Sequence, residues 1–119
     1  MSLESNKAGR EGEEMAVRLL MSKGFKVVER NYHFGKGELD IVARDGETLV
    51  FVEVKYRQNM EYGEPEYSIT PQKIKQIKKV ARCYLFEKHI DEVACRFDVV
   101  AILEEKPGSP VINYYKDAF

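Results

Sequence analysis

The feature that most constrains the fold is a pair of apolar segments, about 38–43 and about 48–57, joined by Arg-Asp-Gly-Glu at 44–47. An Asp-Gly pair between such segments is among the strongest short-range signals for a β-hairpin, because both central residues of a type I′ turn need positive φ. The segment therefore predicts two antiparallel strands around a two-residue loop, Asp45 and Gly46. In that register Arg44 pairs with Glu47, Asp40 with Phe51 and Glu38 with Glu53.

Four charged side chains interrupt these apolar strands, namely Glu38, Asp40, Glu53 and Lys55. Side chains alternate between the two faces of a strand, so the predicted register puts all four on one face. Asp40 and Glu53 become diagonal neighbours, within reach of each other's side chains. A three-residue loop would reverse the alternation and separate the two acids, so this inference depends on the turn.

Two carboxylates held together in a sheet interior must share a proton, meet a cation or raise their pKa values. Lys55 could neutralise one of them, and a divalent cation would neutralise more. Mg²⁺ prefers oxygen ligands, typically one or two carboxylates completed by waters. Asp40 and Glu53, with the carbonyl of Val54, would form such a half-shell for Mg²⁺ or Mn²⁺. Lys55 would then orient an attacking water or stabilise charge developing on a phosphate.

A second interpretation of the same residues is a strand with one solvated face, since charged and apolar residues also alternate there. Against it, the face that carries the acids also carries Val42, Leu49 and Phe51 in the predicted register. A mixed face of this kind is typical of the mouth of a cleft. The residues alone leave both interpretations open.

The rest of the chain predicts two helices and three further strands in a single domain, 1–119. A helix over about 6–23, capped by Ser5 or Asn6, ends before Gly24, and a helix over 70–87 begins with Thr70 as its N-cap and Pro71 in its first turn. The second helix can serve as a right-handed crossover between parallel strands. The order is αβββαββ, an α/β fold with a mixed sheet flanked by helices. The further strands are expected at about 25–29, 95–103 and 111–115, with a glycine-flanked loop at 33–37.

One of two adjacent glutamates on the first helix lies on its apolar side. At 100° per residue, Glu13 falls inside the apolar arc, close in angle to Leu20, whereas Glu14 falls well outside it. Glu13 therefore either faces the interior or reaches water from the edge of the arc.

Positive charge gathers on the second helix although the whole chain has a formal net charge of −1. That balance argues against a general nucleic-acid binder unless the basic residues share one face. A ridge of basic side chains at helical spacing meets this condition. It is also compatible with an ordinary solvated helix face. The ridge consists of Lys75, Lys78, Lys79 and Arg82, extended by Lys73 and Lys88, and the loop before it carries Tyr62, Gly63 and Tyr67, which could grip a distorted strand.

The remaining features place the chain among cytoplasmic proteins. No apolar run approaches the roughly 18 residues that a membrane span needs, and the N-terminus lacks a signal-peptide core. Cys83 and Cys95 are expected to be reduced thiols, and no Cys/His cluster indicates a zinc site.

An acidic residue on one strand followed by Glu-x-Lys on the next, here Asp40, Glu53 and Lys55, resembles the PD-(D/E)XK nuclease superfamily, with Leu39 in place of the proline. The segments "GREGEEMAVRLLMSKGFKVVERNY", "GELDIVARDGETLVFVEVKYR", "YGEPEYSITPQKIKQIKKVARCYL" and "CRFDVVAI", and the terminal "DAF", resemble the YraN-like family. The resemblance covers nearly the whole chain. It implies a restriction-endonuclease-like, three-layer fold close to that of the Holliday junction resolvases.

The resemblance also implies roles for individual residues. Asp40 and Glu53 would be metal ligands, Lys55 the catalytic lysine and Glu13 the acidic residue that related resolvases supply from the first helix. Glu38 would lie outside the set of direct metal ligands and help to position them, and Arg57 would contact a phosphate. The substrate would be DNA of branched or otherwise structured form, and a homodimer is expected because related resolvases act on symmetric junctions.

Three functions are therefore carried forward. The first is a Mg²⁺-dependent endonuclease acting on DNA. The second is a non-catalytic nucleic-acid-binding or adaptor protein on a nuclease fold, since a fold does not fix a function. The third is a small interaction protein whose inward charges form an internal ion network.

Overall fold

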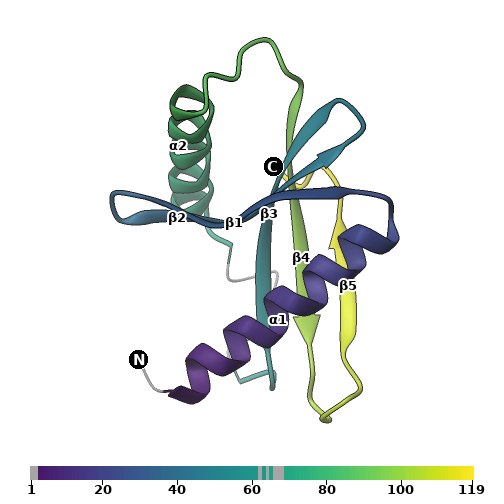
Figure 1. The fold of residues 1–119 in the computed structure, drawn as a ribbon. Coiled ribbons are helices and arrows are strands. Elements are labelled where there is room, and N and C mark those ends of the chain that lie inside the picture. Colours follow the sequence, from purple (N-terminus) through teal and green to yellow (C-terminus); the bar gives the residue numbers. More distant parts are fainter. Residues whose placement is uncertain (1–2, 62, 64, 66–68) are drawn as a thin grey trace.

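The computed structural model describes residues 3–61, 63, 65 and 69–119, with the side chains of residues 3–8 left aside. The elements follow the predicted order αβββαββ (Figure 1). They are α1 (Leu3–Ser22), β1 (Lys26–Phe34), β2 (Gly37–Asp45), β3 (Thr48–Arg57), α2 (Pro71–Glu87), β4 (Cys95–Leu103) and β5 (Val111–Tyr115). Tyr62 and Tyr67, which were considered as strand-gripping residues, lie outside the described residues.

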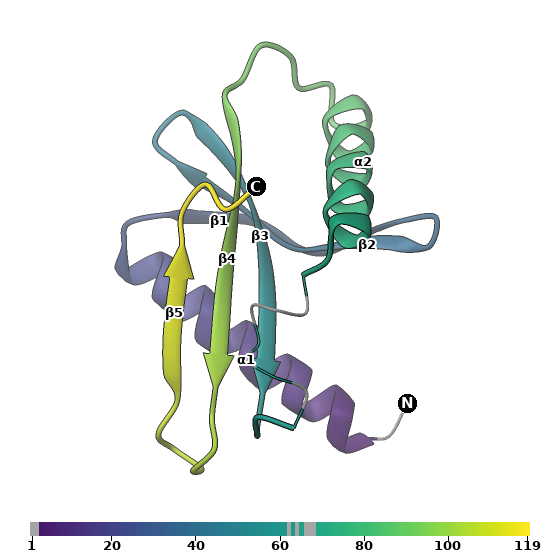
Figure 2. The same ribbon diagram turned by 180° about the vertical axis from the view of Figure 1, so that it is seen from behind.

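The five strands form one mixed sheet in the order β1-β2-β3-β4-β5. Neighbouring strands are antiparallel except β3 and β4, which are parallel and joined by α2, as the crossover prediction requires. The two helices lie on opposite faces of the sheet, which Figures 1 and 2 show from the two sides. The fold is thus the three-layer α/β arrangement of the restriction-endonuclease-like class.

Each helix covers its own half of the core. Under α1, Ala16 and Leu20 pack against the face that carries Ile41, Val50 and Val100. Under α2, the buried side chains are Tyr32, Leu39, Val42, Leu49, Phe51, Ile77, Val80, Ala81 and Tyr84. The predicted mixed face is therefore real, because Val42, Leu49 and Phe51 are buried on the α2 side. Neither described helix combines the length and the apolar character needed to cross a membrane.

The β2–β3 hairpin forms with a different loop from the predicted one. Asp45 pairs with Thr48 and Arg44 with Leu49, so the two loop residues are Gly46 and Glu47. Of these two only Gly46 has positive φ, +61°, as a type II′ turn with glycine at its first central position requires. Asp45 stays in the strand because Arg96 of β4 holds its carboxylate in an ion pair at 2.9 Å.

This correction moves every partner on β3 by two residues and so leaves the faces unchanged. The described pairing runs to Ile41 and Val52, and Val42 lies opposite Phe51. Continuing the register by one pair places Asp40 opposite Glu53. The two acids are thus direct cross-strand neighbours. The predicted diagonal arrangement was wrong, and the observed register brings the two acids closer together than predicted.

Two further boundaries differ from the sequence prediction. Helix α1 begins at Leu3, so Ser5 and Asn6 lie inside it and do not cap it. Strand β1 runs to Phe34 and so enters the segment 33–37 that was expected to be a loop, because Phe34 pairs with Gly37 in a second hairpin and leaves only Gly35 and Lys36 between the strands. The start of α2 is as predicted, with the Thr70 hydroxyl accepting a hydrogen bond from the Lys73 amide at 3.2 Å.

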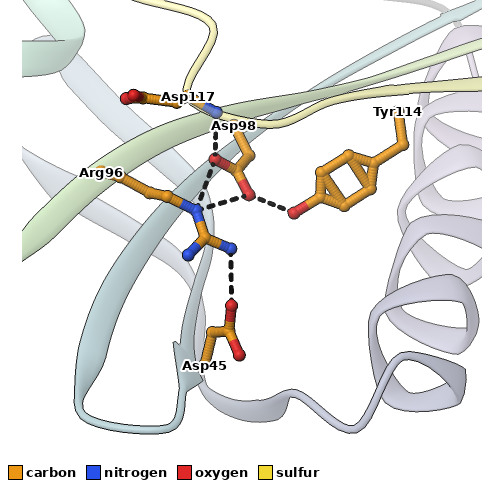
Figure 3. A network of polar contacts seen from close by, with 5 residues as sticks. All are labelled: Asp45, Arg96, Asp98, Tyr114 and Asp117. Atoms are coloured by element: carbon orange, nitrogen blue, oxygen red, sulfur yellow. Dashed lines mark hydrogen bonds and ion pairs between the residues drawn. The ribbon is translucent and has the colours of Figure 1, made fainter.

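A polar network lies at the β4–β5 side of the sheet, away from β1, and Figure 3 shows its five residues. The Asp98 carboxylate of β4 is fully buried. It accepts hydrogen bonds from Arg96 Nε at 3.1 and 3.2 Å, from the Asp117 amide at 2.9 Å and from the Tyr114 hydroxyl. Burial, together with the bond to Asp98, raises the pKa of Tyr114 to about 12. The network ties β4, β5, the C-terminal segment and the β2–β3 turn together.

Candidate active site

The two acids opposite each other on β2 and β3 form the centre of the site. Glu53 is 7% exposed, and Asp40 is half-buried. The Val54 amide donates a hydrogen bond to Asp40 Oδ2 at 2.8 Å, which fixes the Asp40 carboxylate against β3. The backbone of one strand therefore holds the acid of the other at the point where the described β2–β3 pairing ends.

The electrostatics of this pair are those of two carboxyl groups that share one proton. Burial, followed by the hydrogen bond with Asp40 and the charge of Asp40, raises the pKa of Glu53 to about 9. Lys55 and Lys73 act the other way, but burial and the like charge outweigh them. Glu53 therefore holds a proton at neutral pH when no cation is bound.

Glu13 reaches the same region from α1, so the prediction that it faces inward is confirmed. Its carboxylate accepts a hydrogen bond from the Asn31 side chain at 2.9 Å, and its pKa is raised by burial and by the charge of Asp40. Glu14, one residue on, is exposed and pairs with Arg30 at 2.7 Å. A step of one residue, a rotation of about 100° around the helix axis, thus separates a glutamate at the site from a glutamate at the surface.

A glycine sets the distance between α1 and the site. A Cβ on Gly12 would lie 2.7 Å from Tyr56 Cβ, so only a residue without a side chain lets α1 approach β3 this closely. Tyr56 is in turn fixed by its hydroxyl, which donates to Glu104 Oε1 at 2.6 Å. The close approach is what brings the neighbouring Glu13 to the end of β3.

A cleft of about 410 Å³ opens between the start of α1 and the end of β3. Its lining includes the acids Glu13, Glu38 and Asp40 and the cations Lys55 and Arg57. The cleft lining is completed by Gly9, Val54 and Tyr56. Five of the residues predicted for the site, together with the Val54 backbone, therefore meet in one cavity.

Glu53 lines a different recess on the α2 side, with Phe51 and Ile77, and this recess is too narrow to admit a water molecule. Asp40 and Glu38 line both this recess and the cleft. Asp40 thus stands between the open cleft and the buried Glu53. Glu38 is exposed and pairs with His33 at 3.6 Å, at the outer side of the two ligand candidates.

The carboxyl groups of Asp40 and Glu53 suit a hard divalent cation, but they supply only part of its coordination shell. Asp40 and Glu53 supply adjacent oxygens that already share a proton, which a cation could replace, and Mg²⁺ is commonly held by one or two carboxylates with waters. No three His, Cys, Asp or Glu side chains among the described residues are grouped closely enough to hold an ion. The remaining ligands would have to be a backbone carbonyl, such as that of Val54, and water or phosphate oxygens.

The basic residues of α2 divide into different environments. Lys75 and Lys79 are exposed and line, with Lys73, an open pocket of about 540 Å³. Lys78 turns the other way, with its Nζ 5.6 Å from the Phe97 ring centre. Arg82 is exposed beyond them. The predicted single ridge is therefore split, because Lys78 lies over the C-terminal side of the molecule.

Lys73 has a place that the spacing of the ridge did not indicate. It is half-buried, and its charge lowers the pKa of Glu53. The signal was present in the sequence, since at 100° per residue Lys73 lies within about 20° of the buried Val80. Asn31, with φ of 55°, was also missed as the partner of Glu13, because its contact spans two elements.

Comparison with known proteins identifies the family of the chain. Residues 12–102 match the model described as "Uncharacterised protein family UPF0102". The chain belongs to the UPF0102 family. UPF0102 proteins of Geotalea daltonii and Geotalea uraniireducens are 48% and 46% identical to it, over 93% and 98% of this chain and 87% and 91% of their own lengths. A UPF0102 protein of Geobacter sulfurreducens is 44% identical over 93% of this chain and 87% of its own.

The UPF0102 family is the YraN family and is PD-(D/E)XK-like, so the resemblance drawn from Asp40, Glu53 and Lys55 is confirmed at the level of the family. The matched range contains all the predicted site residues from Glu13 to Arg82. The names of these UPF0102 relatives state no activity.

Proposed function

We propose that this UPF0102 protein is a metal-dependent endonuclease that hydrolyses phosphodiester bonds in branched or otherwise structured DNA. One observation supports this above the others: two carboxyl groups that share a proton are held together beside a cleft that also contains a lysine and an arginine. Burial of such a pair costs stability, so an arrangement that keeps it is expected to have a chemical use.

The residues have distinct parts in this reaction. Asp40 and Glu53 would hold Mg²⁺ or Mn²⁺, and Val54 would add its carbonyl oxygen. The bound cation would supply an activated water and offset charge on the scissile phosphate. Lys55, in the cleft, would hold the attacking water or the phosphate oxygen on which charge develops. Glu13 would add a further acidic side chain to the cleft that also contains Lys55.

Arg57 and the α2 lysines would position the DNA backbone. Arg57 lines the cleft at the end of β3, and its Nη1 donates to the Tyr56 carbonyl at 3.0 Å. Lys73, Lys75 and Lys79 line the open pocket on α2, and Arg82 is exposed further along the helix. Lys78 points toward the Phe97 ring and does not share this pocket. Contacts of this kind attract phosphates without reading sequence, so binding would weaken steeply with salt.

The decisive variants are Asp40→Asn and Lys55→Ala, tested on a four-way junction, a flap, a single strand and a plain duplex with Mg²⁺ or Mn²⁺. Each substitution is expected to reduce cleavage by about 100-fold or more while the fold remains. Glu14→Gln is the matched control, because Glu14 adjoins Glu13 but lies at the surface. Unchanged cleavage in Asp40→Asn would contradict the proposed mechanism.

A non-catalytic nucleic-acid-binding protein is the second candidate. It is favoured by the lack of a three-residue metal group among the described side chains. It predicts salt-sensitive DNA binding through Lys75, Lys79 and Arg82 that is indifferent to metal, with no cleavage by the unaltered protein.

A further inference from the structure

The end of the β1–β2 hairpin presents an aromatic side chain to solvent. Phe34 pairs with Gly37, so the loop between them is only Gly35 and Lys36, with Gly35 at φ of +58°. Phe34 is 48% exposed at this end. Figures 1 and 2 both show the hairpin extending past α2. A large apolar ring at the projecting end of a hairpin is unusual, because such ends are ordinarily polar.

The hairpin is anchored firmly just behind its end. The buried Tyr32 ring meets the Tyr84 ring of α2 edge to face, with centroids 5.0 Å apart. A Cβ on Gly37 would lie 2.4 Å from Val80 Cγ2, so β2 passes directly against α2 at this point. Phe34 is therefore carried on a seated hairpin, and its exposure does not come from a loose loop.

Positive charge connects this end to the site. Lys36 is exposed in the turn, and Lys75 and Lys79 are exposed on α2. The nearest neighbours of Gly37 on α2 include Gln76, which lines the same open pocket as Lys73, Lys75 and Lys79. Basic side chains thus extend from Lys73, whose charge acts on Glu53, to the end of the hairpin.

We propose that this hairpin end engages the branch point of the DNA, with Phe34 stacked on an exposed base there. The exposed lysines Lys36, Lys75 and Lys79 suit a polyanion, and the acid beside this end, Glu38, is paired with His33. A base that has lost its neighbour at a branch offers an aromatic face for stacking. The inference rests on the proposed nuclease function and names the feature of the substrate that the protein would recognise.

The position of the hairpin also sets where the cut would fall. Gly37 precedes Asp40 by three residues of β2, which corresponds to about 10 Å along the strand. If a duplex arm runs along β2, its rise of about 3.4 Å per base pair would place the scissile phosphate about three nucleotides from the branch.

The test is binding of a four-way junction and of a plain duplex, each carrying the fluorescent base 2-aminopurine, the junction at its branch. Cleavage is suppressed with Asp40→Asn in every chain tested. Phe34→Ala is expected to lower junction affinity about tenfold relative to duplex affinity and to abolish the fluorescence change at the branch. Phe34→Trp is expected to retain both. Phe86→Ala is the control, because Phe86 is 85% exposed near the other end of α2 and should change neither.

The outcomes separate the two proposals. If Phe34→Ala and Phe86→Ala give the same junction affinity and the same fluorescence, the role of the hairpin is wrong, whatever the cleavage assays show. If the fluorescence change depends on Phe34 but the unaltered protein cuts no DNA, the nuclease proposal fails and the hairpin's role stands. If the protein binds no DNA, both fail.

Discussion

The molecule buries charge in two places, and the two are built in opposite ways. On the β4–β5 side, Asp98 is fully buried, and Arg96, Tyr114 and the Asp117 amide all donate to its carboxylate. On the β2–β3 side, Glu53 is almost as buried, but its closest polar neighbour is a second carboxyl group, that of Asp40. The first cluster surrounds one carboxylate with hydrogen-bond donors, whereas the second places two carboxyl groups beside each other.

The difference indicates what each cluster is for. A buried charge with several donors can hold elements together, and the Asp98 network does so for two strands, a turn and the C-terminal segment (Figure 3). A buried pair of acids contributes nothing of this kind unless a cation joins it. We therefore regard the Asp98 network as structural and the Asp40–Glu53 pair as the functional site.

The largest effect is expected from removing the satisfied charge. Asp98→Ala leaves Arg96 buried without its main partner and should lower the free energy of unfolding by about 3–5 kcal/mol. Urea denaturation followed by circular dichroism measures this loss. Asp91→Ala, at an exposed aspartate, is the control and should stay within about 0.5 kcal/mol of the unaltered protein. A small loss in Asp98→Ala would remove the contrast between the clusters.

The opposite sign is expected at the acidic pair. Glu53→Gln should raise the free energy of unfolding of the metal-free protein at pH 8 by about 1–3 kcal/mol, because an amide needs no proton to be neutral. The folded state holds the Glu53 proton up to a pKa of about 9, whereas the unfolded chain releases it near the ordinary value of 4.5. Between these values the unfolded state binds fewer protons, so stability falls as pH rises, by at most about 1.4 kcal/mol per pH unit.

That slope can be measured by denaturation in the presence of a chelator at several values between pH 5 and 9. Glu53→Gln should flatten it. A slope that persists in Glu53→Gln would show that other groups cause the pH dependence and that the pair is not frustrated.

The smallest expected effect concerns the stability changes caused by substituting two glycines of α1. Gly12→Ala would force α1 away from Tyr56 and should cost about 1 kcal/mol, since overpacking outweighs the better helix propensity of alanine. It should also move Glu13 from Asp40 and reduce cleavage. Gly9→Ala in the same helix meets nothing within 4 Å and should stabilise the protein by about 0.5–1 kcal/mol. Thermal unfolding compares the two, and equal stability changes would contradict the close approach.

The same contrast explains what could be predicted from the sequence. The order of elements, the start of α2 at Thr70 and the shared face of Asp40 and Glu53 follow from local patterns, and these predictions are confirmed. The loop of the β2–β3 hairpin was misplaced, because Asp45 is held in its strand by Arg96 from a distant part of the chain.

Side chains whose roles depend on such distant partners were also missed. The sequence analysis assigned Asp98 only to a strand over about 95–103, although this residue is the centre of a buried network. Asn31 meets Glu13 only because β1 passes beside α1. The periodicity of a segment predicts which face of its own helix or strand a side chain lies on, but it does not predict which other element packs against that face.

The most direct test of the central claim is calorimetric titration of the protein with Mn²⁺ near pH 7.5, repeated in buffers of different ionisation enthalpy so that released protons are counted. If the Asp40–Glu53 pair is kept for a cation, binding should release about one proton, because the ion displaces the proton held by Glu53. Both binding and proton release should be lost in Asp40→Asn and retained in Glu14→Gln. Mn²⁺ binding that is absent, or that is unchanged in Asp40→Asn, would contradict the assignment of this pair as the metal site.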